Sequence, residues 1–181
     1  DQDAAGDTVI FNDTLTATTL NVAAGGVAYD VELNGGGTIT NFVDFKNTGT
    51  VQIGNSNTDD MLFVNGFEVT DPSALTFGGT IRTTNTAITL DTASTLNANT
   101  TFNAGAAAIV VSSTVQGGAA GNNLVLTNTG AGNDITISAV LGATTNLGDL
   151  TVTSGRNTLI SANITTSGNQ VYNSAVVTMV T

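Results

Sequence analysis

Few side chains in this sequence could take part in catalysis. Histidine and cysteine are absent, and the only cations are Lys46, Arg82 and Arg156. A nucleophile needs a neighbouring base such as His or Lys, and polysaccharide lyases and hydrolases combine acids with such groups on one face. The adjacent acids Asp59 and Asp60 would point to opposite faces of a strand, so they would not converge on one bond. We therefore predict no enzymatic activity, no catalytic residues and no cofactor.

A covalent crosslink is the remaining reaction that the lysine could support. Lys46 could form an isopeptide bond with an asparagine, with Asp44 or Glu32 as the assisting acid. The lysine lies in the sequence FKNTG, however, which is typical of the entry to a turn. We favour a surface turn over a crosslink.

Two segments could offer oxygen ligands to calcium. GNSNTDD (54–60) carries Asn55, Asn57, Asp59 and Asp60, but it lacks the following glycine and the bidentate Glu of a calcium loop. GAGNDITI (130–137) resembles one copy of the calcium-binding nonapeptide, which functions only in consecutive copies. We favour a solvated hairpin tip at 55–60, with bound calcium as the alternative there, and a simple turn at 130–137. No metal site is predicted.

Charge excludes two classes of partner. Only 9% of the 181 residues are charged and the net charge is −11, against about 25% charged residues in an average soluble domain. Three dispersed cations cannot form the basic face that nucleic acid requires, nor attract an anionic membrane surface. No apolar run approaches the roughly 18 residues of a membrane span. We expect neither nucleic-acid binding nor membrane insertion.

The elements that position these residues are predicted to be short strands. Apolar residues alternate with Thr, Ser and Asn, and Gly, Asn and Asp separate the alternating runs, which indicates strands joined by tight turns. The segments we predict as strands are 8–12, 15–22, 29–33, 38–45, 50–53, 61–64, 74–77, 81–83, 87–90, 101–102, 108–111, 123–126, 134–138, 149–153, 157–160, 163–165 and 170–178.

The length and spacing of these segments favour a right-handed parallel β-helix, an all-β solenoid. A sandwich core usually takes more aromatic residues than the 5% found here. Polar residues also recur in patterns that could stack on successive turns. The residues we expect in such rows are Asn97, Asn99, Asn103, Thr83, Thr84, Thr86 and Thr89. At about 20 residues per turn the chain would form about nine turns, a rod of roughly 40 Å.

The chain is predicted to form one solenoid domain over residues 1–181. Ten of its fourteen acids, and most of its Phe residues, precede residue 69. This composition changes near residues 71–73, where the only proline lies, and we interpret the change as a corner within one structure. The acidic segment 1–14 is predicted to be an N-terminal cap, or a strand donated to another subunit.

Three passages resemble the repeats of a known family. SALTFGGTIRTTNTAITLDTASTLNANTTFNAGAAAIVVSSTVQGG (73–118), NDITISAVLGATTNLGDLTVTSGRNTLISANITTSGNQVYNSAVV (133–177) and ELNGGGTITNFVDFKNTGTVQIGN (32–55) are similar to filamentous-haemagglutinin-like and autotransporter-like bacterial adhesins. The resemblance implies a β-helix stalk, export to the bacterial cell surface, and adhesion or matrix building. It implies no catalytic residues.

Two functions fit these expectations. The first is a non-catalytic structural or adhesive module of an exported surface protein, which forms a stalk or an extracellular filament and could contact a surface glycan or matrix. The alternative is an ice-binding solenoid, because LTATTL (15–20), ITIS (135–138) and LTVTS (150–154) contain Thr pairs. A carbohydrate-binding or carbohydrate-processing β-helix ranks below it. The absence of cysteine and the start at Asp1 favour a processed, extracellular chain. The uncharged, apolar C-terminal segment predicts end-to-end self-association, either between separate chains in a filament or between turns of a longer parent chain.

Overall fold

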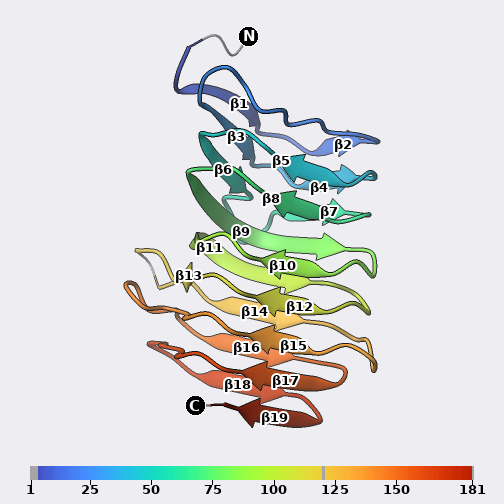
Figure 1. Ribbon diagram of the computed structural model, residues 1–181, viewed down its shortest axis with the longest axis vertical. Coiled ribbons are helices and arrows are strands. Elements are labelled where there is room, and N and C mark those ends of the chain that lie inside the picture. The colour runs from blue at the N-terminus through green and yellow to red at the C-terminus, as the bar shows by residue number, and fades with distance from the viewer. Residues whose placement is uncertain (1–3, 120, 181) are drawn as a thin grey trace.

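The computed structural model describes residues 4–119 and 121–180. The chain coils into a rod of eight stacked turns, with its two ends at opposite ends of the long axis (Figure 1). Every strand pairs in parallel with the equivalent strand of a neighbouring turn. The predicted all-β parallel solenoid is therefore confirmed. The described residues contain no helix, and so none that could cross a membrane.

The strands form three faces. The first contains β1 (Asp7–Phe11), β3 (Tyr29–Leu33), β6 (Thr50–Ile53), the beginnings of β9 (Ala74–Thr83) and β11 (Ser94–Asn103), and β13 (Val115–Gln116). Bridges through Leu141 and Ile164 extend it. The second contains β2 (Leu15–Ala17), β4 (Gly37–Ile39), β7 (Asp60–Phe63), the ends of β9 and β11, β14 (Leu124–Thr127), β16 (Leu150–Thr153) and β18 (Gln170–Asn173). The third contains β5 (Val43–Phe45), β8 (Phe67–Val69), β10 (Ile88–Leu90), β12 (Ile109–Val111), β15 (Ile135–Ile137), β17 (Asn157–Ile160) and β19 (Val176–Met179).

The solenoid has eight turns, one fewer than the approximately nine predicted. That prediction assumed turns of equal length. The register pairs Leu75 with Ser94 but Val115 with Leu141, and more of the chain lies between the second pair than between the first. The loops at the corners vary in length, and the longer loops raise the mean number of residues per turn. The chain therefore forms fewer turns than predicted.

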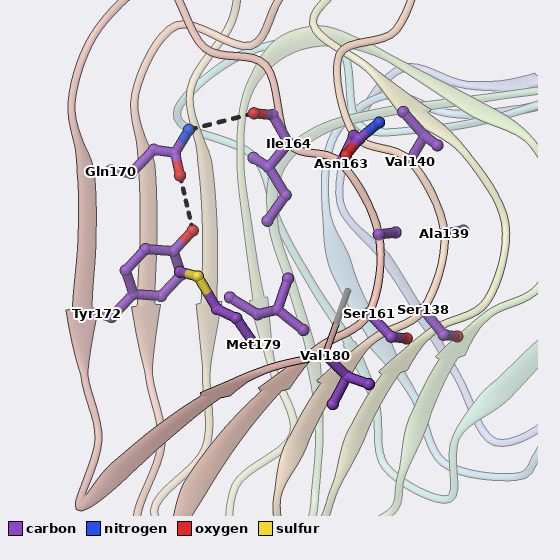
Figure 2. Close-up of a pocket in the computed structure, with 12 residues that line it drawn as sticks. Ser138, Ala139, Val140, Ser161, Asn163, Ile164, Gln170, Tyr172, Met179 and Val180 are labelled. Carbon is purple, nitrogen blue, oxygen red and sulfur yellow. Dashed lines mark hydrogen bonds between the residues drawn. The ribbon is translucent and has the colours of Figure 1, made fainter.

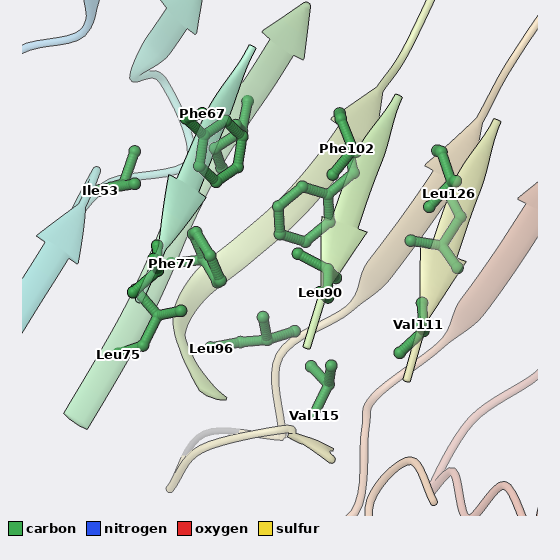
Figure 3. Close-up of a cluster of buried hydrophobic side chains, with 14 of the residues drawn as sticks. Ile53, Phe67, Leu75, Phe77, Leu90, Leu96, Phe102, Val111, Val115 and Leu126 are labelled. Carbon is green, nitrogen blue, oxygen red and sulfur yellow. The ribbon is translucent and has the colours of Figure 1, made fainter. Parts of the chain in front are cut away.

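The core consists of the inward-facing residues of the strands. Alternate residues of nearly every strand are buried, as the period of two requires. The phenylalanines of the core lie in the first five turns. They include Phe77 and Phe102, whose rings meet edge to face with centroids 4.9 Å apart. Later turns have Leu, Ile and Val in place of these rings, and nearly all the buried apolar residues form one cluster, part of which Figure 3 shows.

Two glycines let one strand turn a corner without a loop. β9 passes from the first face to the second through Gly78 and Gly79. Gly79 has a φ of +76°, and a Cβ there would clash with the carbonyl oxygen of Asp59. Only glycine is compatible with both the conformation and the contact. We had predicted two separate strands here, at 74–77 and 81–83.

The segments with unusual composition lie within the stack. Residues 71–73 form the corner between β8 and β9, where the Ser73 N–H donates to the carbonyl oxygen of Gly49 in the turn before, at 2.8 Å. Of the acidic segment 1–14, β1 forms the first strand of the stack and pairs with β3. Residues 1–3 lie outside the described part of the chain.

Candidate functional site

Both arginines are engaged in ion pairs with acids of the preceding turn. Arg82 makes a bidentate contact with Asp60, with Nε and Nη2 at 2.6 and 2.9 Å from the two carboxylate oxygens. Arg156 Nε lies 3.6 Å from Asp134 Oδ1. Asp134 belongs to the segment 130–137, which forms a turn leading into β15. These pairs link successive turns on the outside of the rod.

The lysine is also paired, and its surroundings do not favour a crosslink. Lys46 Nζ is half-exposed and lies 3.0 Å from Asp44 Oδ2. Burial alone would raise the pKa of Asp44, but hydrogen bonds from Thr70 and Lys46 outweigh burial, so this pKa lies below its ordinary value of 3.8. Glu32, the other acid proposed to assist, belongs to the first face, whereas Asp44 belongs to the third. Neighbouring Asn47 is buried, and its amide donates to two backbone carbonyls at 3.0 Å.

The oxygens of the candidate calcium segment 55–60 bind groups of the protein itself. Asp59 Oδ2 accepts from the N–H groups of Asn55 and Ser56 at 2.8 and 2.9 Å. Asn57 Oδ1 accepts from a backbone N–H two turns away, and Asp60 binds an arginine. Among the described residues no group of three or more acids could hold a metal ion. This segment acts as a hydrogen-bonded turn that leads into β7.

A line of side-chain oxygens runs along the corner between the first and second faces. Asn99 Oδ1 accepts from the backbone N–H of Asn123 at 2.9 Å. Asn123 Oδ1 accepts from Asp149 N–H at 2.7 Å, and Asp149 Oδ1 from Asn169 N–H at 2.6 Å. Asn57 begins the line: its Oδ1 reaches past the glycine corner of β9 to the Asn99 N–H at 2.8 Å. We call these five residues, Asn57, Asn99, Asn123, Asp149 and Asn169, the corner ladder. The side-chain oxygens of the first four each satisfy a backbone donor that a corner would otherwise leave unpaired.

The prediction that Asn97, Asn99 and Asn103 stack in a row was wrong for two of these three residues. Asn97, Asn99 and Asn103 all lie in β11, so they cannot stack on one another, and only Asn99 belongs to the corner ladder. Asn97 donates to Gln52 Oε1 at 2.8 Å, and Asn103 accepts locally from the Gly105 N–H. The signal that could have found the ladder is an Asn or Asp three residues before an inward apolar residue, repeated from turn to turn.

The threonines do not form a continuous row. Thr16 and Thr153 share one outward column of the second face, but Leu62 and Arg82 lie between them in that column. Thr136 lies on the third face. The threonines predicted to stack belong to a single turn: Thr83, Thr84, Thr86 and Thr89. No face of the described residues therefore presents the regular Thr pairs that an ice-binding solenoid would need.

The last turn leaves its inward side chains partly open to solvent. Ile164, Tyr172 and Met179 line an open hollow of about 760 Å³, with Met179 65% exposed (Figure 2). Val177, the other inward residue of β19, is also exposed. The Tyr172 hydroxyl donates to Gln170 Oε1 at 2.8 Å, and partial burial raises the pKa of this phenol. In the preceding turn the partners of these four inward side chains are fully or almost fully buried: Leu141, Val152, Thr158 and Ile160.

The first turn presents a matching open edge. In the described residues β1 pairs only with β3, and β2 only with β4. Its inward apolar residues are partly buried against the core: Val9, Phe11, Leu15 and Leu20. Two acids, Asp7 and Asp13, lie in this turn, whereas no acid follows Asp149 in the sequence. The two ends are thus both apolar inside but differ in charge.

A shallow groove lies beside an exposed aromatic ring. Phe42 is 49% exposed at the corner between the second and third faces. The groove has a volume of about 250 Å³ and its lining includes two carboxylates, those of Glu68 and Asp91. This groove is another hollow of the described residues that could receive a molecule.

Comparison with known proteins adds no relative. No known protein family, curated protein or solved structure matches this chain. What stands established is the fold, a parallel β-solenoid.

Proposed function

We propose that this chain is a non-catalytic structural module of an exported bacterial surface protein, in which the stack is a stiff spacer within a stalk or filament. One observation carries the proposal: eight parallel turns share a single continuous core, and the corner ladder joins successive turns from outside that core. In such a stack each turn packs mainly on its neighbours, so the length of the rod grows with the number of turns. A rod of this kind serves to hold its two ends a fixed distance apart and not to catalyse a reaction.

Two further features support a spacer over an enzyme. All three cations are held in ion pairs, and the acids that we considered for catalysis are already bound to protein donors. The sequence also resembles filamentous-haemagglutinin-like and autotransporter-like adhesins, whose repeats build stalks outside the cell. We therefore propose the bacterial cell surface as the location of this chain.

Removal of one whole turn tests the spacer function. Ser94 pairs with Val115 in the next turn, so deletion of residues 94–114 keeps every later strand in register. We expect the shortened chain to fold, and a distance between labels on either side of the deletion to fall by about 4.8 Å. Deletion of residues 94–104 removes about half a turn and is the matched control, which should not fold.

Two results would contradict the proposal. If the in-register deletion unfolds as readily as the half-turn deletion, the turns do not act as interchangeable spacing units. If the intact chain releases sugar from a polysaccharide, the module is catalytic.

Contact with a surface glycan is a second candidate function. The observation in its favour is Phe42, an exposed aromatic ring beside two carboxylates in a shallow groove. Aromatic faces pack on apolar faces of ligands, and carboxylates accept hydrogen bonds from hydroxyl groups. Binding on a glycan array that Phe42→Ala abolishes and Ile10→Ala, at another exposed apolar side chain, preserves would support it. Equal binding by both variants would exclude this groove.

A further inference from the structure

The two ends of the rod occupy equivalent positions in the register. On the second face, pairings from turn to turn place Leu15 and Tyr172 in one inward column, seven steps apart. On the first face they place Val9 and Ile164 in another. If another turn stacked in register on the last turn, its inward residues would have to occupy the same columns. The inward residues of the first turn occupy these columns.

The hydrogen bonds of the corner ladder all run in one direction along the stack, and the last turn has an acceptor that is not used. Each side-chain oxygen accepts from the backbone N–H of a later turn, so Asn169 contributes its N–H but its Oδ1 has no partner in the described residues. Asn169 lies three residues before Tyr172. In the first turn, the residue three before Leu15 is Asn12, and its side chain already accepts from Asn34 at the same corner of the second turn at 3.2 Å.

We propose that the first turn of a second copy of this chain stacks on the last turn, head to tail, with Asn12 over Asn169. This inference rests on the proposed structural function and names its partner. The Asn12 N–H then donates to Asn169 Oδ1, and the ladder continues across the junction. β2 pairs with the free edge of β18, Val9 packs on Ile164 and Leu15 on Tyr172.

The charge distribution favours this orientation over a head-to-head pair. Two first turns facing each other would bring four acids, Asp7 and Asp13 of each copy, into one interface. The last turn has no acid, so a first turn meets no repulsion there. Two last turns could also meet, but symmetric pairing would leave both Asn169 side chains without an N–H to accept from. Head-to-tail contacts repeat without closing, so they produce a filament with a repeat of about 38 Å, eight turns of about 4.8 Å.

Two neighbouring valines of β19 provide a matched test. Val177 faces inward, opposite the buried Thr158, while Val176 faces outward and is 54% exposed. We expect the 181-residue chain to form a concentration-dependent series of oligomers in sedimentation velocity. V177K should abolish the series, and V176K, which adds the same charge one residue away, should leave it unchanged. Circular dichroism at low concentration verifies that both variants fold.

Cysteine pairing tests the register, because the chain has no native cysteine. We expect an oxidised mixture of N12C and N169C chains, distinguished by mass, to yield a mixed dimer and little of either homodimer. A strict monomer at all concentrations, or N169C pairing mainly with itself, would overturn the proposal. Neither result would contradict the proposed spacer function, because the turn deletion tests that function separately, within a single chain.

Discussion

Replacing Phe102 by alanine removes the side chain at the centre of the stack. Phe102 is fully buried, lies between Ile81 and Leu126 of the neighbouring turns, and meets Phe77 edge to face at 4.9 Å. Truncation of a buried Phe costs about 3–5 kcal/mol, of which an aromatic pair contributes about 0.5–1.5. We expect a loss in this range, a factor of about 10² to 10³ or more in the unfolding equilibrium.

Urea unfolding followed by circular dichroism measures this loss, and hydrogen exchange locates it. Because the core residues of each turn pack mainly on those of the neighbouring turns, protection should fall most in β9, β11 and β14. T101A is the matched control: Thr101 is the adjacent residue and faces outward, so its loss should change stability by about 0.5 kcal/mol or less. Equal unfolding midpoints for F102A and T101A would refute the inward and outward assignment of β11.

Three further substitutions test the corner, the ladder and the ion pair. G79A should cost about 1–3 kcal/mol because of its positive φ and the clash of the new Cβ with the Asp59 carbonyl oxygen, while G26A, with nothing within 4 Å, should be nearly neutral in the same urea titration. N123A should lower the melting temperature, since it removes the acceptor of a backbone N–H at 2.7 Å at a cost of about 1–3 kcal/mol; N163A, an exposed asparagine, should not. Because the pKa of Asp44 is lowered in the folded chain, the stabilisation from its carboxylate is present above its ordinary value of 3.8 and is lost as pH falls through the folded value. D44N should therefore be less stable than the native chain at pH 7, and this difference should shrink as the pH falls below 3.8; a difference that does not change with pH would contradict this.

Strand alternation made the fold predictable from the sequence. In segments such as 29–33 and 109–111, apolar residues at every second position indicated which side chains face the core, and the structure buries them. The short length of these segments and the scarcity of aromatic residues then favoured a solenoid over a sandwich. These are local signals, which a single sequence contains in full.

The corners were harder to predict because they depend on contacts between turns. Segment 38–45 was predicted as one strand, but it forms β4 and β5 with a corner between them. In contrast, β9 continues through Gly78 and Gly79, where two strands were expected. Whether the chain bends or continues at such a position depends on which residues of the adjacent turn lie beside it. Those residues can be named only when the register between the turns is known.

The same limitation hid the candidate site. Asn99 was identified as a stacking residue, but the next members of the ladder, Asn123 and Asp149, lie in later turns, and those turns differ in length. The spacing of an Asn or Asp three residues before an apolar residue is present in the sequence, but without the register it does not show which of these residues lie at the same corner. The apolar C-terminal segment was visible, whereas the inward direction of Val177 and Met179 was not.

The distance across the stack tests most directly whether the chain is a stiff spacer. Thr16 and Thr153 lie in one outward column, six steps apart, and spin labels can be attached at T16C and T153C because the chain has no other cysteine. Dipolar spectroscopy on labelled chains diluted with unlabelled chains should show one narrow distribution, with about 29 Å between the labelled backbone positions at about 4.8 Å per step. A broad or multiple distribution under native conditions would contradict a rigid stack, and with it the proposed function.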